Sequence, residues 1–536
     1  MSVTSNSPDL TLGIPRGLTG KYLKDQSIPQ ARWQPQEQVE VHEKLAYDPA
    51  NPQGKILFGA IGSKLIGYAD NRHIMTVAGN RSGKSVTLKA NLFFYDGSAL
   101  IIDPKGELAC DTASHRAAMG QDVFVLDPFE IVSGDAAQFR AQYNELETLD
   151  IESETVIEDA MQVVDGQIVS SGRENDPHWN EAAGGAMLGL VLFAKFGQGL
   201  KPHQRNMIMV RKMINDAMKQ EIIHDDVPSE GIEGAQELPQ GKAVYSLPHQ
   251  IMRGIEHLRN TPNEDIAEAI EASVTGLYDK SPDEMASVLS TMKRHTAYLD
   301  FRSMRKIRQG HDFDLRDLKR KKNGVTIYVC LPATRMGSCK RWMRVIINQL
   351  IEAMEKETAI PDVPVLAALD EFPVLGFMQT LQDAAGQIAS FGLRMWYIAQ
   401  DWGQCEAIYE KRWESFAANC GVNQWFANTD LKTCEYVSKR LGKTPVLSMR
   451  EGDTSYEQRD KGLSGQSASK QLYDLLTPDE VARTFARSDP LKRQIIHIAG
   501  LDPVILQRIE YWDEKAAYAS HFALFKSQGN YSVASS

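Results

Sequence analysis

A glycine-rich segment of eight residues, AGNRSGKS at 78–85, most constrains what this chain can fold into. It directly follows the apolar run from Ile74 to Val77 and opens a stretch whose pattern suits a helix. A strand, a tight turn and a helix in this order aim backbone N–H groups and the positive end of the helix at a phosphate group. The segment therefore predicts a phosphate-binding loop within an α/β sheet.

The residue types in the loop predict a role for two of its side chains. Lys84 would reach the β- and γ-phosphates of a nucleoside triphosphate, and the Ser85 hydroxyl would bind Mg²⁺. The pattern usually begins with glycine where this chain has Ala78, and a chance glycine-rich turn is the alternative interpretation. The predicted nucleotide-binding residues are Gly79, Asn80, Arg81, Ser82, Gly83, Lys84 and Ser85.

A pair of carboxylates follows a later apolar run, VLAAL at 365–369. Open α/β sheets bind ligands at the carboxyl ends of their strands, so Asp370 and Glu371 are placed where a phosphate loop would need them. Asp370 would hold Mg²⁺ and Glu371 would polarise the attacking water. A helix cap or a surface pair is the alternative. Gln400, which ends the next predicted strand, would sense the γ-phosphate or orient water, although a capping role is equally compatible with its position.

Short apolar runs alternate with helical stretches on both sides of a long middle segment. Strands are predicted near 98–103, 122–127, 325–332, 364–370, 394–400 and 422–427, and two more at 494–499 and 504–512. Such alternation indicates a doubly wound, mostly parallel sheet. From 151 to 312 the helical pattern dominates, with a loop predicted at 222–241, which indicates an all-helical insertion. A polar, mobile stretch is predicted at 448–470, and Thr477 to Glu480 has the pattern of a capping box.

Composition excludes several classes of protein. With 536 residues the chain needs more than one core, and its net charge of -11 argues against a surface that coats nucleic acid as a whole. The six cysteines show no CxxC spacing, so neither a zinc site nor a disulfide framework is indicated. No apolar stretch approaches the ~20 residues that span a bilayer.

A basic run from 302 to 322 contains nine Lys and Arg residues among three aspartates. It could touch a phosphate backbone, but a solvated face before a strand is the favoured interpretation. Farther on, Lys340, Arg341, Trp342 and Arg344 mix basic residues with an aromatic one, which could equally belong to the core.

These motifs together resemble the TraG/TraD-type coupling proteins of conjugation and type IV secretion, over about residues 50–515. The matching segments are AGNRSGKS at 78–85, DPKGEL at 103–108, LDEFPVLG at 369–376, IAQ at 398–400, LLTPDEV at 475–481 and IIHIAGLDPVILQRIEYW at 495–512. The resemblance implies a RecA-like P-loop NTPase domain with an inserted all-α domain, and a hexameric ring. It further implies an ATPase, using ATP and Mg²⁺, that recruits a DNA–relaxase complex or protein effectors to a type IV secretion channel and drives DNA transfer.

Residue by residue, the resemblance assigns Lys84 and Ser85 to the Walker A motif, Asp370 and Glu371 to the Walker B pair, and Gln400 to the glutamine motif. Lys84, Glu371 and Gln400 are thus the predicted catalytic residues, and Ser85 and Asp370 the predicted metal ligands. Asp103 and Lys105 match a segment expected to shape the site. A neighbouring subunit's arginine is also expected, with Arg394 and Arg440 as candidates.

The expected domains are a polar segment at 1–45, the two parts of the nucleotide-binding domain at 46–150 and 313–515, the cargo-recognising insertion at 151–312 and a polar tail at 516–536. Family members generally begin with transmembrane helices, where this chain has the polar segment. The expectation is therefore a variant without such helices, located in the cytoplasm or peripherally at the inner membrane through a partner.

Two other functions stay open. One is a recruitment adaptor that binds nucleotide with little turnover, and the other is a soluble DNA translocase of the FtsK/HerA sort. The long helical insertion argues against the second.

Overall fold

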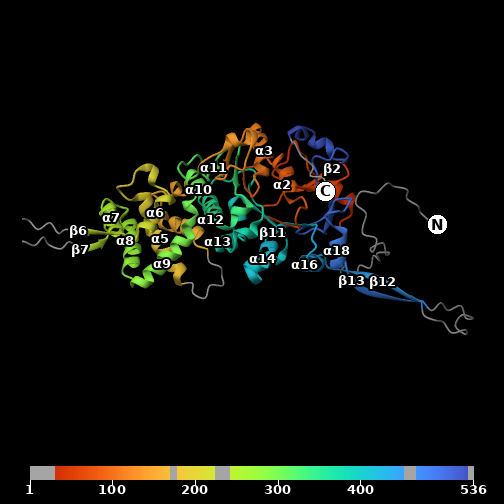
Figure 1. Cartoon of the computed structure of the whole chain (residues 1–536). Coiled ribbons are helices and arrows are strands. Elements are labelled where there is room, and N and C mark those ends of the chain that lie inside the picture. The colour runs from red at the N-terminus through yellow and green to blue at the C-terminus, as the bar shows by residue number, and fades with distance from the viewer. Residues whose placement is uncertain (1–30, 170–177, 224–241, 452–465, 529–536) are drawn as a thin grey trace, which may run out of the picture.

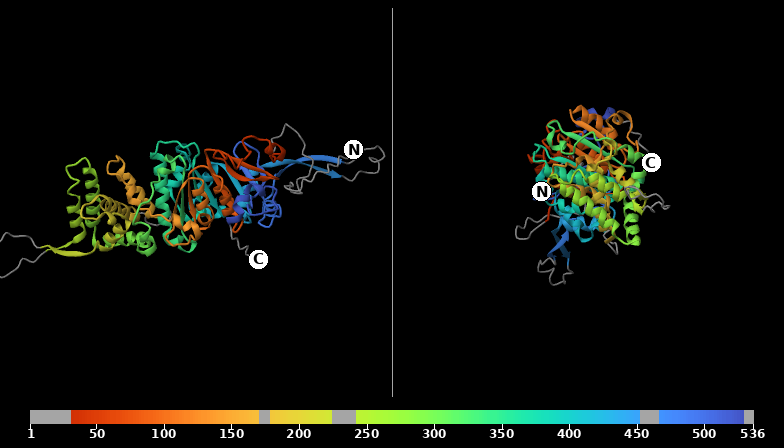
Figure 2. Two further views of the ribbon diagram at one scale, coloured as in Figure 1. Left: turned by 90° about the horizontal axis from the view of Figure 1, so that it is seen from above. Right: turned by 90° about the vertical axis from the view of Figure 1, so that its left-hand side faces the viewer.

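The computed structural model describes residues 31–169, 178–223, 242–451 and 466–528. Within these ranges the molecule is elongated, with a helical part at one end and a large sheet flanked by helices in the rest (Figure 1). A long hairpin of two strands projects from the end opposite the helical part (Figure 2). The described residues thus form a helical part and a sheet part.

The described residues form one sheet of eleven strands, in the order β2-β1-β15-β14-β11-β3-β10-β9-β4-β8-β5. The strands from β11 to β5 in this order run parallel, and the other four extend the sheet in antiparallel fashion. Their bounds are β1 Ile56–Ile61, β2 Lys64–Tyr68, β3 His73–Ala78, β4 Ala99–Asp103, β5 Asp122–Leu126, β8 Val325–Cys330, β9 Val365–Leu369, β10 Leu393–Ala399, β11 Cys420–Phe426, β14 Arg493–Ile498 and β15 Val504–Gln507. The predicted α/β, mostly parallel sheet is confirmed.

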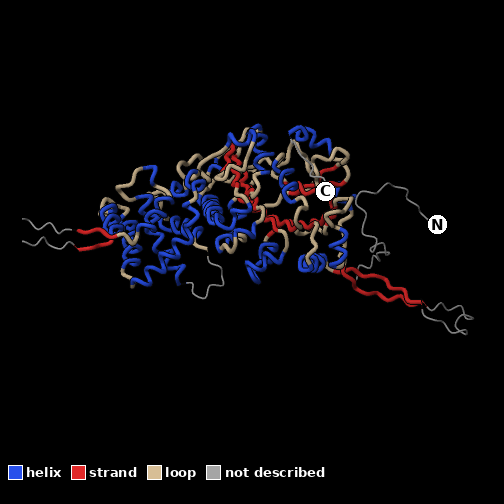
Figure 3. The backbone as a smooth tube through the Cα atoms, viewed as in Figure 1, coloured by secondary structure: helices blue, strands red, loops and turns tan. Residues whose placement is uncertain are grey.

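Helices cover this sheet, as Figure 3 shows. β3, β9 and β10 are completely buried in the middle of the parallel part, so their apolar runs form core rather than surface. The helices of this part are α1 Gln36–Glu40, α2 Lys84–Leu92, α3 Glu107–Ala118, α11 Asp317–Arg320, α12 Ala333–Lys356, α13 Gln379–Ala384, α14 Trp402–Tyr409, α15 Trp413–Ala418, α16 Leu431–Leu441 and α18 Pro478–Thr484.

The helical part is built around α5, which is apolar along most of its length and packs against α4, α6, α8 and α9. The bounds are α4 Val156–Gln167, α5 His178–Phe196, α6 Met207–Asp216, α7 Ser246–Ile255, α8 Glu264–Tyr278, α9 Pro282–Thr296 and α10 Arg302–Lys306. A short antiparallel hairpin, β6 Gln220–Ile223 with β7 Lys242–Tyr245, interrupts the helices, so the expectation of helix alone is wrong there. Its turn, and most of the loop predicted at 222–241, lies outside the described residues.

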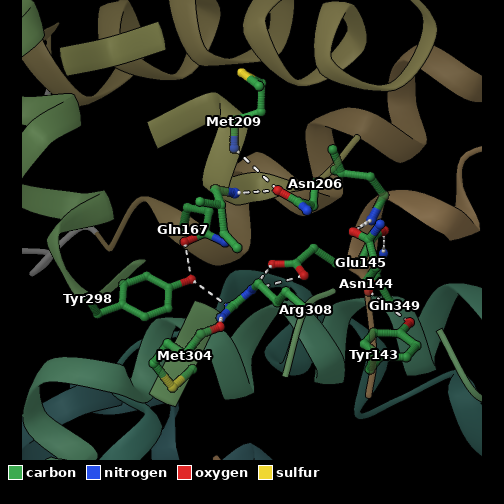
Figure 4. Close-up of polar contacts among 12 residues, drawn as sticks. Tyr143, Asn144, Glu145, Gln167, Asn206, Met209, Tyr298, Met304, Arg308 and Gln349 are labelled. Atoms are coloured by element: carbon green, nitrogen blue, oxygen red, sulfur yellow. Dashed lines mark hydrogen bonds and ion pairs between the residues drawn. The ribbon is translucent and has the colours of Figure 1, made fainter. Parts of the chain in front are cut away.

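A buried ion pair joins the helical part to the sheet part (Figure 4). Arg308, which follows α10, lies 2.8 Å from Glu145 and also donates a hydrogen bond to the hydroxyl of Tyr298. Tyr298 in turn donates to Gln167 at the end of α4, while Gln349 of α12 donates to the backbone oxygen of Glu145. Both charged side chains are essentially inaccessible to water. The junction is therefore a hydrogen-bonded polar network, in which the Nε2 of Gln167 has no hydrogen-bond partner among the described residues.

Three segments differ from the sequence-based expectation near the carboxyl end. The stretch predicted as mobile at 448–470 belongs in its described parts to two paired strands, β12 Lys443–Glu451 and β13 Gln466–Asp474, and residues 452–465 lie outside the description. The last strand ends at Gln507 rather than Trp512. The tail after 516 is not simply polar, because Phe522 is buried and Phe525 stacks on Phe93. The predicted capping box of Thr477 and Glu480 is confirmed.

In the described parts of the chain, no helix is long and apolar enough to cross a membrane.

Candidate functional site

The glycine-rich loop connects β3 to α2, as the sequence predicts. Gly83 has a φ of 98° and starts the helix, a conformation that favours glycine. At Gly79 the limit is space, since a Cβ atom would lie 2.2 Å from the backbone oxygen of Ala427. The Ser82 hydroxyl closes the turn by donating to the Gly79 carbonyl at 2.6 Å. The loop is thus tightly held against β11.

Lys84 lies at the centre of the site. Its ammonium group donates to the backbone oxygen of Ala78 at 3.0 Å and lies 3.6 Å from a carboxylate oxygen of Glu371. Ala78, which stands where the pattern usually has glycine, therefore binds Lys84 through its backbone carbonyl. Its methyl group is buried. The sequence placed Lys84 in the loop after one strand and Glu371 after another, and the structure brings the two side chains together.

Asp370 and Ser85 face each other at the end of β9. The two side-chain oxygens are 3.4 Å apart, and the other oxygen of Asp370 is buried without a hydrogen-bond partner among the described residues. Burial, and then the charge of Glu371, raise the pKa of Asp370 to about 7. A cation beside this carboxylate would relieve both penalties, so the pair fits a divalent metal ion.

The described residues contain no group of three or more His, Cys, Asp and Glu side chains that could hold a metal by themselves. Mg²⁺ commonly takes one or two protein oxygens and completes its shell with water and substrate phosphates. Ser85 and Asp370 together provide that number. The predicted metal ligands are therefore adjacent and chemically suitable.

Glu371 is held in an unusual conformation. Its φ of 61° lies in the left-handed region, which costs a non-glycine residue free energy. Gln400 donates its amide N–H to both carboxylate oxygens, at 3.0 and 3.1 Å. With Lys84 on the same carboxylate, Glu371 is fixed from two sides and aimed at the glycine-rich loop. The contact places Gln400 where it can position the Glu371 carboxylate, and it gives no support to a capping role.

Asp103 shapes the neighbouring loop rather than facing the site. Its carboxylate accepts hydrogen bonds from the backbone N–H groups of Lys105 and Ala109, which fixes the start of α3. Burial raises the pKa of Asp103 to about 6. Lys105, by contrast, lines the cavity described next.

A cavity of about 410 Å³ opens over the glycine-rich loop, and its other wall comes from the end of the chain. Arg508 follows β15 and donates to the Ser82 carbonyl at 2.8 Å. The sequence-based prediction missed the residues of this wall, which are Arg487, Lys492, Arg508, Ile509, Glu510 and Trp512. They are more than 400 residues from the loop, and only the pairing of β14 and β15 with the sheet brings them there.

Burial and contacts also bear on three other sets of candidate residues. Most of the basic run at 302–322 is paired with carboxylates at exposed positions, as in Lys306 with Glu130 and Lys321 with Asp122, which supports a solvated face there. Arg308 and Lys319 of the same run are buried. Trp342 is completely buried and therefore belongs to the core.

Arg394 is buried within β10 and donates to the Gly54 carbonyl, so it cannot reach a neighbouring subunit. Arg440 is exposed on α16.

Comparison with known proteins agrees with the motifs. A model of the family described as "Type IV secretory system Conjugative DNA transfer" matches residues 21–532. The chain is 26% identical over 433 residues to the conjugal transfer protein TraG of Escherichia coli, covering 78% of this chain and 62% of that protein. It is 23% identical over 465 residues to the type IV secretion system-coupling protein VirD4 of Bartonella quintana, covering 84% and 64%. The chain thus spans somewhat less than two thirds of the length of these relatives.

Two solved structures share the fold. One is the bacterial conjugative coupling protein TrwBdeltaN70 in complex with sulphate, with a TM-score of 0.59, 14% identity, and coverage of 91% of this chain and 97% of that chain. The other is the plasmid coupling protein TrwB in complex with ADP and Mg²⁺, with a TM-score of 0.56, 13% identity, and coverage of 90% and 94%.

Proposed function

Since this chain belongs to the family of type IV secretory system conjugative DNA transfer proteins, we propose that it is an ATP-hydrolysing coupling protein. It recruits a DNA–relaxase complex, or protein effectors, to a type IV secretion channel and uses ATP and Mg²⁺ to drive DNA transfer. The proposal includes a homo-hexameric working state at the inner face of the cytoplasmic membrane, docked on channel components or on a membrane-anchored partner. The observation that carries it is the convergence of Lys84, Glu371 and Gln400 on one point above the glycine-rich loop.

A few residues would bind the phosphates and the metal ion of the nucleotide. The backbone N–H groups of residues 79–85 surround the β- and γ-phosphates, and Lys84 neutralises part of their charge. Ser85 and Asp370 would hold Mg²⁺, which would supply positive charge beside the phosphate oxygens. The cavity beside the loop, with Lys105 and Arg508 on its walls, leaves room for the rest of the nucleotide.

Hydrolysis requires a water molecule in line with the bond between the γ-phosphorus and the β–γ bridging oxygen. Glu371 accepts a hydrogen bond, and then the proton, from this water as its oxygen bonds to phosphorus. The bridging oxygen leaves with the ADP. Gln400 keeps the carboxylate oriented by its two short contacts, so it acts as a positioning residue.

The test is ATP hydrolysis by the purified chain with and without single- and double-stranded DNA. Lys84→Ala should lose nucleotide binding and hydrolysis. Glu371→Gln should keep nucleotide binding and lose roughly 10²–10⁴-fold in kcat, the usual range for a general base. Full hydrolysis and transfer by Lys84→Ala would refute the proposal.

The two other functions are outcomes of the same test. Turnover near zero in the wild type, with nucleotide bound and transfer unaffected by Glu371→Gln, would favour the adaptor. ATP-driven movement along duplex DNA without any channel component would favour the translocase.

A further inference from the structure

Four cationic side chains gather between the end of α9 and the first half of α12. They are Arg294, Lys340, Arg341 and Arg344, called here the α12 cluster. Arg294 is exposed, Lys340 and Arg341 are half-buried, and Arg344 is buried, so the charges lead from the surface inward. His295 lies between them, accepting a hydrogen bond from Arg341 at 3.3 Å and contacting Arg294 at 3.5 Å.

Within the described residues, none of the four side chains of the α12 cluster forms an ion pair with a carboxylate. Their contacts there are with neutral groups, backbone carbonyls and the His295 ring. Asp165 on α4 interacts with Arg344 only at longer range than an ion pair. Burial, and then the charges of Arg344 and Arg341, lower the pKa of Lys340, and burial followed by Arg341 and Arg294 lowers that of His295 to about 3.

Such a group of cations without ion pairs is unusual among the residues that the structure describes. The net charge is -11, and the basic run at 302–322 contains mostly ion-paired side chains. Like charges that are half-buried together destabilise a fold unless an anion offsets them. Their arrangement therefore indicates an anionic partner rather than a solvated face.

The α12 cluster also contacts the segment that follows Glu371. Arg344 donates to the backbone oxygens of Leu375 and Phe377, at 3.2 and 2.5 Å. Between them, Gly376 has a φ of 75° and lies so close to Lys340 that a Cβ atom there would be 3.3 Å from the ammonium nitrogen. Glu371 starts the short helix Phe372–Leu375 that leads into this contact. A ligand on the α12 cluster would thus act on the backbone four to six residues from the proposed catalytic base.

We propose that the α12 cluster binds the phosphate backbone of DNA and transmits its presence to Glu371 through the Leu375–Phe377 segment. This inference rests on the proposed function for its ATPase readout. DNA fits better than an acidic protein segment for two reasons. Its phosphates form a dense, continuous row of charge that Arg294, Lys340 and Arg341 can contact together, and the family to which the chain belongs is one of DNA transfer.

The first experiment measures binding of labelled single- and double-stranded oligonucleotides to the full chain over a range of salt concentrations. The test variant is Arg294→Gln/Lys340→Gln, and the matched control is Lys306→Gln/Lys321→Gln, which removes the same charge from ion-paired positions. We expect the test variant to lose roughly tenfold in affinity, with a slope of log K against log salt shallower by about 2, and the control to stay within about twofold. Arg341→Gln, with melting temperatures of all variants, separates loss of binding from loss of fold.

Equal binding by the test and control variants would overturn the proposal. So would a test variant that binds DNA like the wild type but loses binding of polyglutamate, which would assign the α12 cluster to an acidic protein segment.

The second experiment measures the ratio of ATPase rates with and without DNA. The test variant should lose most of the stimulation and the control should keep it. A wild type that is stimulated by DNA, with both variants equally stimulated, would leave the proposed function standing and overturn the link to Glu371. A wild type without hydrolysis, whose test variant still loses DNA binding, would refute the ATPase and leave the DNA contact standing.

Discussion

At the scale of single residues, the site depends on how Glu371 is held. Its left-handed backbone conformation costs free energy, and the contacts with Lys84 and Gln400 offset that cost. Asp370 differs, because Ser85 is its close neighbour and one of its oxygens has no hydrogen-bond partner among the described residues. Neighbouring carboxylates thus suit different tasks, one as a base and the other as a metal ligand.

Gln400→Ala tests the positioning of Glu371. We expect kcat to fall roughly 10- to 100-fold, because the carboxylate loses the two hydrogen bonds that orient it, while nucleotide affinity changes less than about threefold. Rates and nucleotide binding of the purified variant give both quantities. Gln404→Ala, on α14, is the control for loss of an amide. Wild-type kcat in Gln400→Ala would show that Lys84 alone orients the base.

Gly79→Ala tests the close approach of the loop to β11. The added methyl group would meet the Ala427 carbonyl at 2.2 Å, so the loop must move, at a cost of about 1–3 kcal/mol. We expect nucleotide affinity to fall about tenfold or more. Gly185→Ala is the control, because a Cβ atom at this position in α5 meets nothing within 4 Å. Affinity equal to that of the control would contradict the argument.

At the scale of elements, the buried Arg308–Glu145 pair determines how firmly the helical part is attached. Arg308→Met leaves the Glu145 carboxylate buried without its partner, which typically costs about 3–5 kcal/mol. We expect a clear loss of stability in thermal and urea unfolding. Removing both charges in Arg308→Met/Glu145→Gln should recover part of it, and Lys306→Gln, at an exposed pair, should change it by less than about 1 kcal/mol. An Arg308→Met variant as stable as Lys306→Gln would contradict this account.

The elements that could be predicted from the sequence are those that local patterns define. Apolar runs such as 365–369 became buried strands, and the glycine-rich loop and the carboxylates fell at strand ends, where parallel topology brings them together. The antiparallel strands β1 and β2 and the hairpin β12-β13 were missed. Apolar and polar residues alternate only weakly in these strands. Their pairing depends on strands that are distant in the sequence or partly polar.

The same reason explains why one wall of the cavity was missed. Arg508 lies in the matching segment 495–512, but no residue pattern there indicates a ligand. Its contact with the Ser82 carbonyl exists only because β15 pairs with both β14 and β1. Phe522 and Phe525 lie in a segment of mixed composition, and their respective partners Phe94 and Phe93 directly follow the end of α2. Contacts over such sequence distances follow from the assembled sheet rather than from local pattern.

For the whole molecule, the proposed ring raises the question of which group of a neighbouring subunit completes the site. A ring of identical subunits joins different surfaces head to tail, so each site can lie between two neighbours. Arg394 is excluded by its burial, and Arg440 is the exposed candidate that remains from the sequence. An arginine supplied in trans to a phosphoryl-transfer site typically raises kcat by about 10³–10⁵-fold.

Mixing two inactive variants tests this arrangement. Arg440→Ala and Glu371→Gln should each be nearly inactive alone but should complement each other, because some sites combine an intact Glu371 with an intact neighbouring Arg440. In a randomly mixed ring about one quarter of the sites do so, which sets the rate expected relative to the wild type. Sedimentation of each variant and of the mixture with an ATP analogue confirms assembly, and Lys439→Ala, the adjacent exposed cation, is the control. If the mixture assembles but recovers no activity, Arg440 is excluded. The two variants can complement each other only when one subunit supplies Glu371 and its neighbour supplies Arg440 to the same site.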